Sequence, residues 1–340
     1  MKLTLQKLIS NAKKNLFRNP SDGFITLVLL LVILYSTINT FDWFFNIANW
    51  DVITKNLNLY ITGSFPQPEK WRANIWIGLL SGLCFFTFFS SKNKKLKILL
   101  PVLWILIIPS GIYLLSGGLG LAEVKTNYWG GLLLTLILTC CSAAIAFLLG
   151  LILAIGRQSN LQLIRTLCRV YIDLMRALPL IAVLFFGQLL IPLFLPVGFE
   201  INRFTRAVLA FGFFAAAYVA EDIRGGMQAI PSTQYEAAKV LGLNSKQTLE
   251  LIILPQAIRT AIPALTNQAI GLLQNTSLMA ILGLVELLGV SRSILANPKF
   301  IGNYLEVYVW LAIIYWFICT IVALIARHIE TQMNPTNPVR

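Results

Sequence analysis

Long apolar runs alternate with short polar segments along almost the whole chain. About 20 predominantly apolar residues are enough for a helix to cross a lipid bilayer. Eight runs approach or exceed that length: roughly 24–40, 73–90, 98–116, 128–155, 168–195, 204–226, 256–290 and 303–326. The pattern therefore predicts an all-α integral membrane protein with about eight transmembrane helices.

The seventh run is too long for one straight span. It contains Gly283 and Gly289, and glycine is unfavourable inside a helix. We expect this run to break, with a second short helix beginning near Asn275.

Composition and charge placement agree with a membrane protein. Hydrophobic residues make up 57% of the 340 residues, charged residues 12%, and the net charge is +13. The basic residues cluster in alternate polar segments (2–18, 92–97 and 157–169), which is the positive-inside pattern. It predicts a multi-pass membrane protein with both termini and residues 227–255 in the cytoplasm. No basic face carries interleaved aromatic residues, so the charge does not indicate nucleic-acid binding.

Candidate chemistry is sparse. The five cysteines lie in or beside apolar runs at spacings that fit neither a metal site nor a disulfide framework. The chain has one histidine and contains no HExxH, no GxSxG and no phosphate-binding GxxxxGK[ST] motif. We therefore expect no catalytic residue, cofactor or metal on this chain, and no enzymatic activity. If a nucleotide drives the protein, ATP and Mg²⁺ must be bound by a separate subunit.

The chain divides near residue 120. Residues 1–120 hold three predicted spans and an external loop at 41–72 that is rich in Trp and Phe, residues favoured at a membrane interface. A Gly-rich segment, 116–124, follows as a hinge. Residues 121–330 hold five spans, residues 331–340 form a cytoplasmic tail, and no internal repeat is present.

The polar segment 231–255 predicts two short helices on the cytoplasmic membrane face. Thr233 and Glu236 are spaced as a capping box, and Gly242 suits the left-handed position that ends a helix. Asn244 and Gln247 repeat the start signal, and Pro255 is expected to break the second helix where the next span begins. Taken singly, each of these residues could serve only to start or end a helix.

The spacing of the same segment carries more information than its single residues. It reads EAA-x3-G-x9-I-x-L-P without a gap, and resembles the EAA loop of bacterial ABC-importer permeases. The resemblance implies that the first short helix contacts a separate ATP-binding subunit and transmits its closure. The implied coupling residues are Glu236, Ala237, Ala238, Gly242, Ile252, Leu254 and Pro255.

Stretches at 171–186, 215–243 and 253–278 resemble the polar amino acid uptake family of permeases: the histidine, glutamine and general L-amino-acid importers. The run 189–196 and the extra N-terminal spans look most like the general L-amino-acid branch. Two departures weaken any inferred substrate preference: Ala177-Leu178 stands where the family has Gly-Thr, and Gln274-Asn275 where it has Lys-Asp. The family implies a location in the bacterial inner (plasma) membrane and a five-helix type I permease core, here with three extra N-terminal spans. It also implies an extracytoplasmic amino-acid-binding protein and a second permease subunit, here a non-identical homologue.

Polar residues within the spans are candidates for the translocation pathway, because ionisable groups in hydrocarbon are costly unless they are paired or face water. Asp173 and Arg176 are one turn apart and could pair with each other. The remaining candidates lie in or after the seventh run: Gln268, Gln274, Asn275, Thr276, Ser277 and Glu286. The sixth run ends in a charged cluster, Glu221, Asp222 and Arg224. For Asp173, Arg176 and this cluster, joining helices near the cytoplasmic surface is an equally good interpretation.

These observations predict a permease subunit of an ATP-driven ABC importer for amino acids, which couples to a separate ATPase. An ABC permease for another small polar solute would share the loop and differ in the spans. A stand-alone secondary transporter would work without an ATPase and often shows an internal repeat. A membrane enzyme would need catalytic residues that the sequence does not offer.

Overall fold

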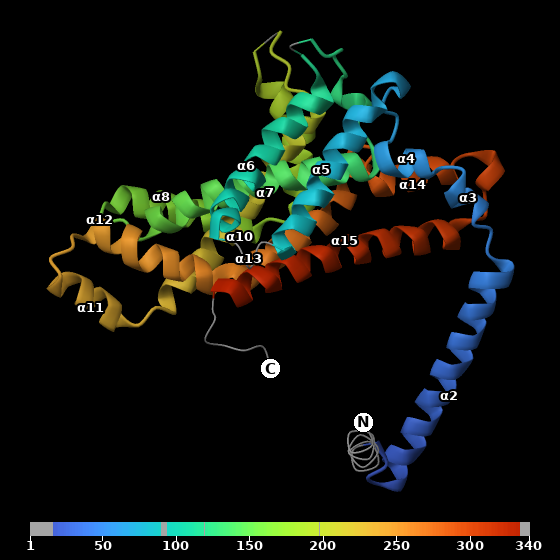
Figure 1. Ribbon diagram of the computed structural model, residues 1–340, viewed down its shortest axis with the longest axis horizontal. Helices are drawn as coiled ribbons and strands as arrows, with labels where there is room; N and C mark the ends of the chain where they lie inside the picture. The colour runs from blue at the N-terminus through green and yellow to red at the C-terminus, as the bar shows by residue number, and fades with distance from the viewer. Residues whose placement is uncertain (1–15, 90–93, 119, 197, 334–340) are drawn as a thin grey trace. The chain divides into compact units, whose positions relative to one another are not determined.

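The computed structural model describes residues 16–89, 94–118, 120–196 and 198–333 (Figure 1). The basic residues predicted at 2–14, part of the 92–97 loop and most of the 331–340 tail lie outside this description. Within it, every regular element is helical apart from two single β-bridges. The α-helices are α2 (Pro20–Asp42), α3 (Asp51–Thr54), α4 (Leu57–Thr62), α5 (Lys70–Phe89), α6 (Lys94–Ser116), α7 (Gly131–Arg157), α8 (Gln162–Ala177), α9 (Leu180–Phe185), α10 (Arg203–Gln228), α11 (Ser232–Val240), α12 (Ser245–Gln247), α13 (Leu254–Asn275), α14 (Leu287–Leu295) and α15 (Tyr304–Met333). The functionally relevant π and 3₁₀ segments are η5 (Phe186–Leu190), η6 (Ile191–Phe194), η7 (Thr248–Ile253) and η8 (Thr276–Leu282).

The described helices confirm an all-helical membrane protein. Seven of them are long and apolar enough to cross a bilayer, and the count is eight if one sharply bent pair is taken as a single span. Six of these seven helices contain or closely match predicted runs. The remaining helix, Ser245–Leu282, begins earlier than the predicted run 256–290.

The predicted span at 168–195 is wrong as a single helix. The chain forms α8 and then the apolar segment Leu180–Phe194, and the two are bent by 106°. Pro179 explains the bend, because a proline disfavours helical geometry in the residue before it. Leu178 is accordingly extended, with φ −85° and ψ 141°.

The predicted break in the seventh run is confirmed at Gly283, which has a left-handed φ of +80°. The change begins at the expected place, because α13 gives way to the 3₁₀ segment η8 at Thr276. The next α-helix, α14, starts only at Leu287. Glu286 therefore follows the break rather than lying late within the span.

Pro255 does not break the second short helix as predicted. Residues Ser245–Leu282 form one continuous helical segment in which the π-helical turn η7 precedes Pro255. In this turn the Leu254 N–H donates to the Leu249 carbonyl, five residues back. A proline in an α-helix clashes with the carbonyl four residues earlier, and the wider turn provides room for the ring.

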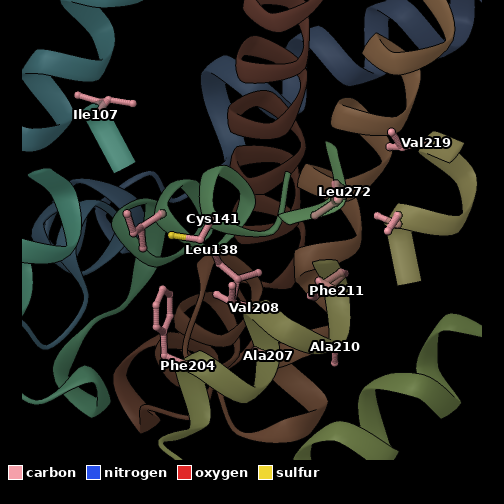
Figure 2. Packing of buried hydrophobic residues seen from close by; sticks show 14 of the residues in the cluster. Ile107, Leu138, Cys141, Phe204, Ala207, Val208, Ala210, Phe211, Val219 and Leu272 are labelled. Atoms are coloured by element: carbon pink, nitrogen blue, oxygen red, sulfur yellow. The ribbon is translucent and has the colours of Figure 1, made fainter. Parts of the chain in front are cut away.

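The core is centred on α7 and α10, which pack closely along their lengths (Figure 2). The Ser142 hydroxyl of α7 donates to the Val208 carbonyl of α10 over 3.3 Å. Ala216 and Ala217 of α10 are fully buried. Small residues therefore bring helices together within this chain. Helix α13 packs on α10, and α15 packs on α13.

The chain forms two compact units, Met1–Val52 and Ile53–Arg340. Helices α5 and α6 belong to the second unit, where α6 packs on α7 and α5 on α15. Buried Arg72 of α5 pairs with Glu69 at 2.9 Å and donates to the Ala122 carbonyl at 2.9 Å. The Gly-rich segment predicted as a hinge is therefore held against α5.

Candidate functional site

Helix α11, the first short helix of the EAA loop, ends as its glycine predicts. Gly242 has φ +76°, a left-handed conformation that disfavours residues with a Cβ. The Leu243 N–H donates to the Ala238 carbonyl at 3.1 Å, and the Gly242 N–H donates to the Lys239 carbonyl at 3.0 Å. These two bonds form a complete Schellman motif, which turns the chain sharply toward α12.

The capping box predicted from Thr233 and Glu236 is wrong. The helix begins at Ser232 after Pro231, and no side chain caps its start. Glu236 therefore lies inside the helix with an exposed side chain. The second start signal is confirmed: Gln247 N–H donates to Asn244 Oδ1 at 2.9 Å, and Asn244 N–H donates to Gln247 Oε1 at 3.0 Å.

Helix α11 exposes a patch that sequence reasoning missed. Val240 is 88% exposed and Leu241 75% exposed, next to the exposed Glu236 and Ala237. Ala238, on the opposite side, is buried. The sequence signal for this patch was the apolar pair Val240 and Leu241, which stands directly before Gly242 in a polar loop. Clustered exposed apolar side chains commonly mark contact surfaces.

The later residues of the EAA pattern face inward. Ile252 and Leu254 are half-buried and pack against the hydrophobic core, while Pro255 is exposed at the start of α13. Because η7 joins α12 to α13 without interruption, α11 is attached to a rigid helix that runs as far as Leu282.

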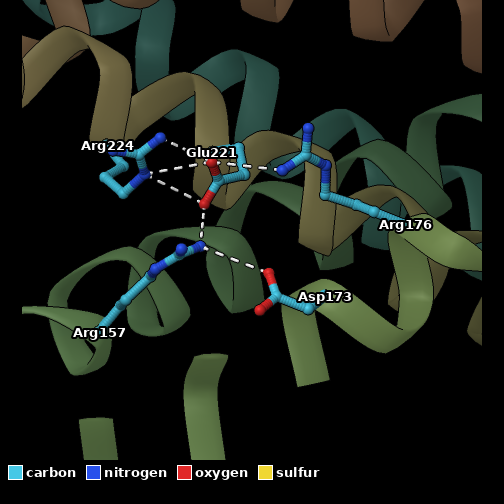
Figure 3. Close-up of polar contacts among 5 residues, drawn as sticks. All are labelled: Arg157, Asp173, Arg176, Glu221 and Arg224. Carbon is cyan, nitrogen blue, oxygen red and sulfur yellow. Dashed lines mark hydrogen bonds and ion pairs between the residues drawn. The ribbon is translucent and has the colours of Figure 1, made fainter. Parts of the chain in front are cut away.

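Glu221 of α10 is the centre of a charge cluster (Figure 3). Its carboxylate pairs with Arg157 at the end of α7, with Arg176 of α8 at 3.3 Å, and with Arg224 at 2.8 Å. Asp173 of α8 lies 3.9 Å from Arg157. The cluster joins three helices around one carboxylate that is largely shielded from solvent.

Asp173 and Arg176 therefore do not pair with each other as predicted. Each pairs with a group on another helix, because Arg157 and Glu221 lie across the helix–helix contacts that α8 makes with α7 and α10. The Arg176 guanidinium also lies over the Tyr218 ring, 5.7 Å from its centroid.

Replacing Glu221 with glutamine is expected to destabilise the folded protein. It leaves Arg157, Arg176 and Arg224 without their shared counter-charge, at a cost of roughly 2–3 kcal/mol for a partly buried pair. The measurement is the unfolding temperature of the purified protein in detergent. The control is Glu250→Gln, which removes an exposed pair with Lys246 at 3.9 Å and should have little effect. Equal unfolding temperatures for both variants would contradict a structural role for the cluster.

A pocket of about 340 Å³ lies between α10 and α13. Gln268 and Asn275, two of the predicted pathway residues, line it with Tyr218 from α10. Its other lining residues are mostly apolar: Leu180, Phe211, Phe214, Ala215, Gly271, Leu272 and Leu278. The volume is in the range of small-molecule sites. The α10 residues were not predicted, although Phe211, Phe214, Ala215 and Tyr218 have the three- and four-residue spacing of one helix face.

Groups of both charges lie beside this pocket. Asp222 follows Tyr218 by one turn and lies within hydrogen-bonding reach of Gln268. Its Oδ2 atom is buried and has no hydrogen-bond partner among the described residues. The Arg176 guanidinium lies over the ring of Tyr218, which lines the pocket.

The remaining pathway candidates lie elsewhere. Gln274 points toward α15, where its Nε2 is 3.8 Å from the Cys319 sulfur, and the Ser277 hydroxyl donates to the Gln274 carbonyl at 2.8 Å. Thr276 is buried, and its hydroxyl donates to the Leu273 carbonyl at 2.7 Å. Buried Glu286 accepts the N–H groups of Leu288 and Gly289 and the Tyr315 hydroxyl. Glu286 thus caps α14 and joins it to α15.

Comparison with known proteins identifies the family. Residues 146–335 match the family model described as binding-protein-dependent transport system inner membrane component. The inner membrane amino-acid ABC transporter permease protein YhdY of Escherichia coli is 34% identical over 342 residues, which covers 95% of this chain and 92% of that protein.

Two further similarities agree. The glutamate/glutamine/aspartate/asparagine transport system permease protein BztC of Rhodobacter capsulatus is 38% identical over 217 residues, 64% of this chain and 50% of that protein. A solved structure, described as the crystal structure of an amino acid ABC transporter with histidines, superposes with a TM-score of 0.54. It is 31% identical and covers 59% of this chain and 92% of that one. The chain belongs to the binding-protein-dependent inner membrane transport components, and it is a multi-pass permease subunit of an ABC importer for amino acids, without a catalytic role of its own.

Proposed function

We propose that α11 is the surface through which a separate ATPase drives this permease, and that α13 carries its movement to the pocket. The continuous helical segment Ser245–Leu282 is the observation that carries this proposal. It joins the Schellman turn after α11 directly to Gln268 and Asn275. A displacement of the turn after α11 therefore reaches the pocket along one continuous helical segment.

The residues of the EAA pattern divide into two roles in this proposal. Glu236, Ala237 and Ala238 build α11, with Val240 and Leu241 as its exposed contact, and Gly242 fixes the turn. Ile252, Leu254 and Pro255 anchor the segment to the core at the beginning of α13.

The pocket between α10 and α13 is proposed as part of the amino-acid pathway. A free amino acid carries an ammonium and a carboxylate, which need groups of opposite charge when water is removed. Asp222 offers an unpartnered carboxylate oxygen, and Arg176 a cation at Tyr218. Gln268 and Asn275 add amide donors and acceptors. Asp173, Gln274, Thr276, Ser277 and Glu286 support the walls rather than contact substrate.

The assembly follows from the family and the charge pattern. We propose an ATP-binding subunit that holds ATP and Mg²⁺, an external amino-acid-binding protein, and a non-identical second permease. Both termini and the EAA loop lie in the cytoplasm. The three N-terminal helices within residues 1–120 are an addition to the permease core at 121–330. Similarity to YhdY over almost the whole chain supports the general L-amino-acid branch.

Gln268→Leu and Asn275→Leu are each expected to reduce amino-acid uptake about tenfold or more. Removing one polar contact leaves a substrate charge without a partner, which costs roughly 1–3 kcal/mol. The measurement is uptake of labelled amino acids by the complete transporter in proteoliposomes. The matched control is Gln274→Leu, because this amide lies on the same helix but faces Cys319.

Uptake that falls equally in all three variants would indicate a general loss of folding. Normal uptake in the Gln268 and Asn275 variants would reject the pocket as the pathway. A third outcome is that an excess of a sugar or an inorganic anion, rather than of unlabelled amino acids, inhibits uptake. That result would favour an ABC permease for another polar solute.

A further inference from the structure

Helix α8 carries an exposed apolar stripe that the permease fold leaves without a partner. Its members lie at intervals of four, three and four residues, which places them on one face of the helix. They are Leu163, Leu167, Val170 and Leu174, with exposed fractions of 72%, 60%, 57% and 52%.

A different face of α8 attaches it to the core. Ile172 is fully buried, and the Tyr171 hydroxyl donates to the Phe213 carbonyl of α10 over 2.8 Å. Cys168 lies against Gly156 of α7. Because these contacts already hold α8 in place, the apolar stripe is not needed for packing within this chain.

A third face is basic. Arg165, Arg169 and Arg176 lie at intervals of four and seven residues on this face. Arg176 pairs with Glu221, whereas no carboxylate of the described residues lies within ion-pair distance of Arg165 or Arg169. Both side chains are exposed, and their positive charge has no counter-charge among the residues that the structure describes.

The bend after α8 indicates how this helix is oriented relative to the membrane. The apolar segment Leu180–Phe194 turns away from it by 106°. If that segment enters the bilayer, a helix almost perpendicular to it runs along the surface. A helix that combines a leucine-rich face with an arginine-bearing face is typical of one that lies in the interface.

The membrane surface along which α8 runs is the one on the side of the EAA loop. A cleft of about 740 Å³ is lined by Ile164 of α8 together with Tyr235 and Lys239 of α11. Helices α8 and α11 therefore lie at the same end of the permease core (Figure 1).

We propose that α8 is an interfacial helix that binds anionic phospholipids. The Leu163, Leu167, Val170 and Leu174 stripe inserts among acyl chains, and Arg165 and Arg169 bind the phosphate groups of anionic headgroups. Charge complementarity selects a lipid as the occupant, because two exposed arginines lie on the polar side of the helix opposite the stripe and the next segment of the chain is itself a membrane element.

Lipid binding at α8 is connected to the charge cluster. The same helix presents Asp173 to Arg157 and Arg176 to Glu221. A headgroup that holds Arg165 and Arg169 thus fixes the helix that carries two members of the cluster. Anionic lipid is therefore expected to stabilise the contact of α8 with α7 and α10.

The first test places a benzophenone photo-crosslinking residue at Leu167 of the assembled transporter in its native membrane. Phospholipid adducts are expected at Leu167. The matched control is Met175 on the core-facing side of the same helix, where adducts should form within the chain. Adducts of Leu167 with the ATPase or with a second permease would overturn the proposal, since a protein surface would then cover the stripe.

The second test compares lipid selectivity. The variant Arg165→Gln/Arg169→Gln and the wild-type transporter are placed in mixed phosphatidylglycerol and phosphatidylcholine, and retained lipid is measured by native mass spectrometry. The preference for phosphatidylglycerol should fall by about fivefold per arginine. The control Arg18→Gln/Arg327→Gln removes the same charge from other parts of the chain and should keep most of the preference.

An unchanged preference in the Arg165→Gln/Arg169→Gln variant would overturn the assignment of headgroup binding to α8. Neither readout requires transport or ATP hydrolysis. A failure here is therefore distinguishable from a failure of the proposed coupling or pathway functions.

Discussion

Replacing Val240 and Leu241 with aspartate is expected to separate this permease from its ATPase. Both side chains project from α11 with little support from the rest of the chain, so the exchange leaves folding intact. Loss of two apolar anchors at a contact surface, with two charges in their place, should weaken association at least about 30-fold. The measurement is the amount of ATPase that co-purifies with the permease, together with ATP-dependent uptake.

The control is Val240→Ile/Leu241→Met, which keeps an apolar surface of similar size. Two variants test the geometry of the same helix. Glu236→Lys reverses an exposed charge, and Gly242→Asp forces a residue with a Cβ into the left-handed turn. Both should reduce association or coupling while membrane insertion stays normal. If the aspartate double variant retained its ATPase and normal uptake, α11 would not be the contact.

Gly226→Ala is expected to destabilise the core strongly, although only one methyl group is added. A methyl group at this position would overlap the Ala257 carbonyl oxygen of α13. A backbone carbonyl cannot rotate away, so α10 and α13 must separate, at a cost of roughly 2–3 kcal/mol. The measurement is the unfolding temperature, with uptake by the surviving protein as a second readout, since these two helices also enclose the pocket.

Gly225→Ala is the matched control. A methyl group there meets no atom within 4 Å. Because alanine favours helix more than glycine does, this variant should be as stable as the wild type or slightly more stable. Equal behaviour of the two alanine variants would show that α10 and α13 do not approach each other as described.

Features that depend on neighbouring residues could be predicted from the sequence. The helix end at Gly242, the Asn244–Gln247 capping box and the break at Gly283 are set by local backbone geometry and short-range hydrogen bonds. The EAA spacing adds a second, independent signal in the same segment. For this reason the turn at Gly242 and the helix start at Asn244 could be predicted, whereas the start of α11 and the effect of Pro255 could not.

Features that depend on distant residues could not be predicted in the same way. Asp173 and Arg176 looked like a local pair, but their partners Arg157 and Glu221 belong to other helices. The start of α11 shows a smaller error of the same kind: Pro231 sets the first turn, so Thr233 falls too late to cap it.

Helix α8 was misjudged because two different patterns are adjacent in the sequence. Its apolar residues follow a helical period among charged ones, whereas Leu180–Phe194 is continuously apolar. When hydropathy is averaged across Pro179, these two segments look like one membrane span. The pocket face of α10 was missed for the converse reason, since Phe211, Phe214 and Tyr218 look like ordinary lipid-facing residues until α13 is placed beside them.

The π-helical turn at Thr248–Ile253 fixes how far α11 is rotated about the axis of α13 relative to the pocket residues. Such a turn holds one more residue than an α-helical turn, and each helical residue rotates the chain by about 100°. A one-residue deletion that made this segment regular would swing α11 around the axis of α13 while Gln268 and Asn275 stayed where they are. Related chains should therefore vary the sequence of this turn more freely than its length.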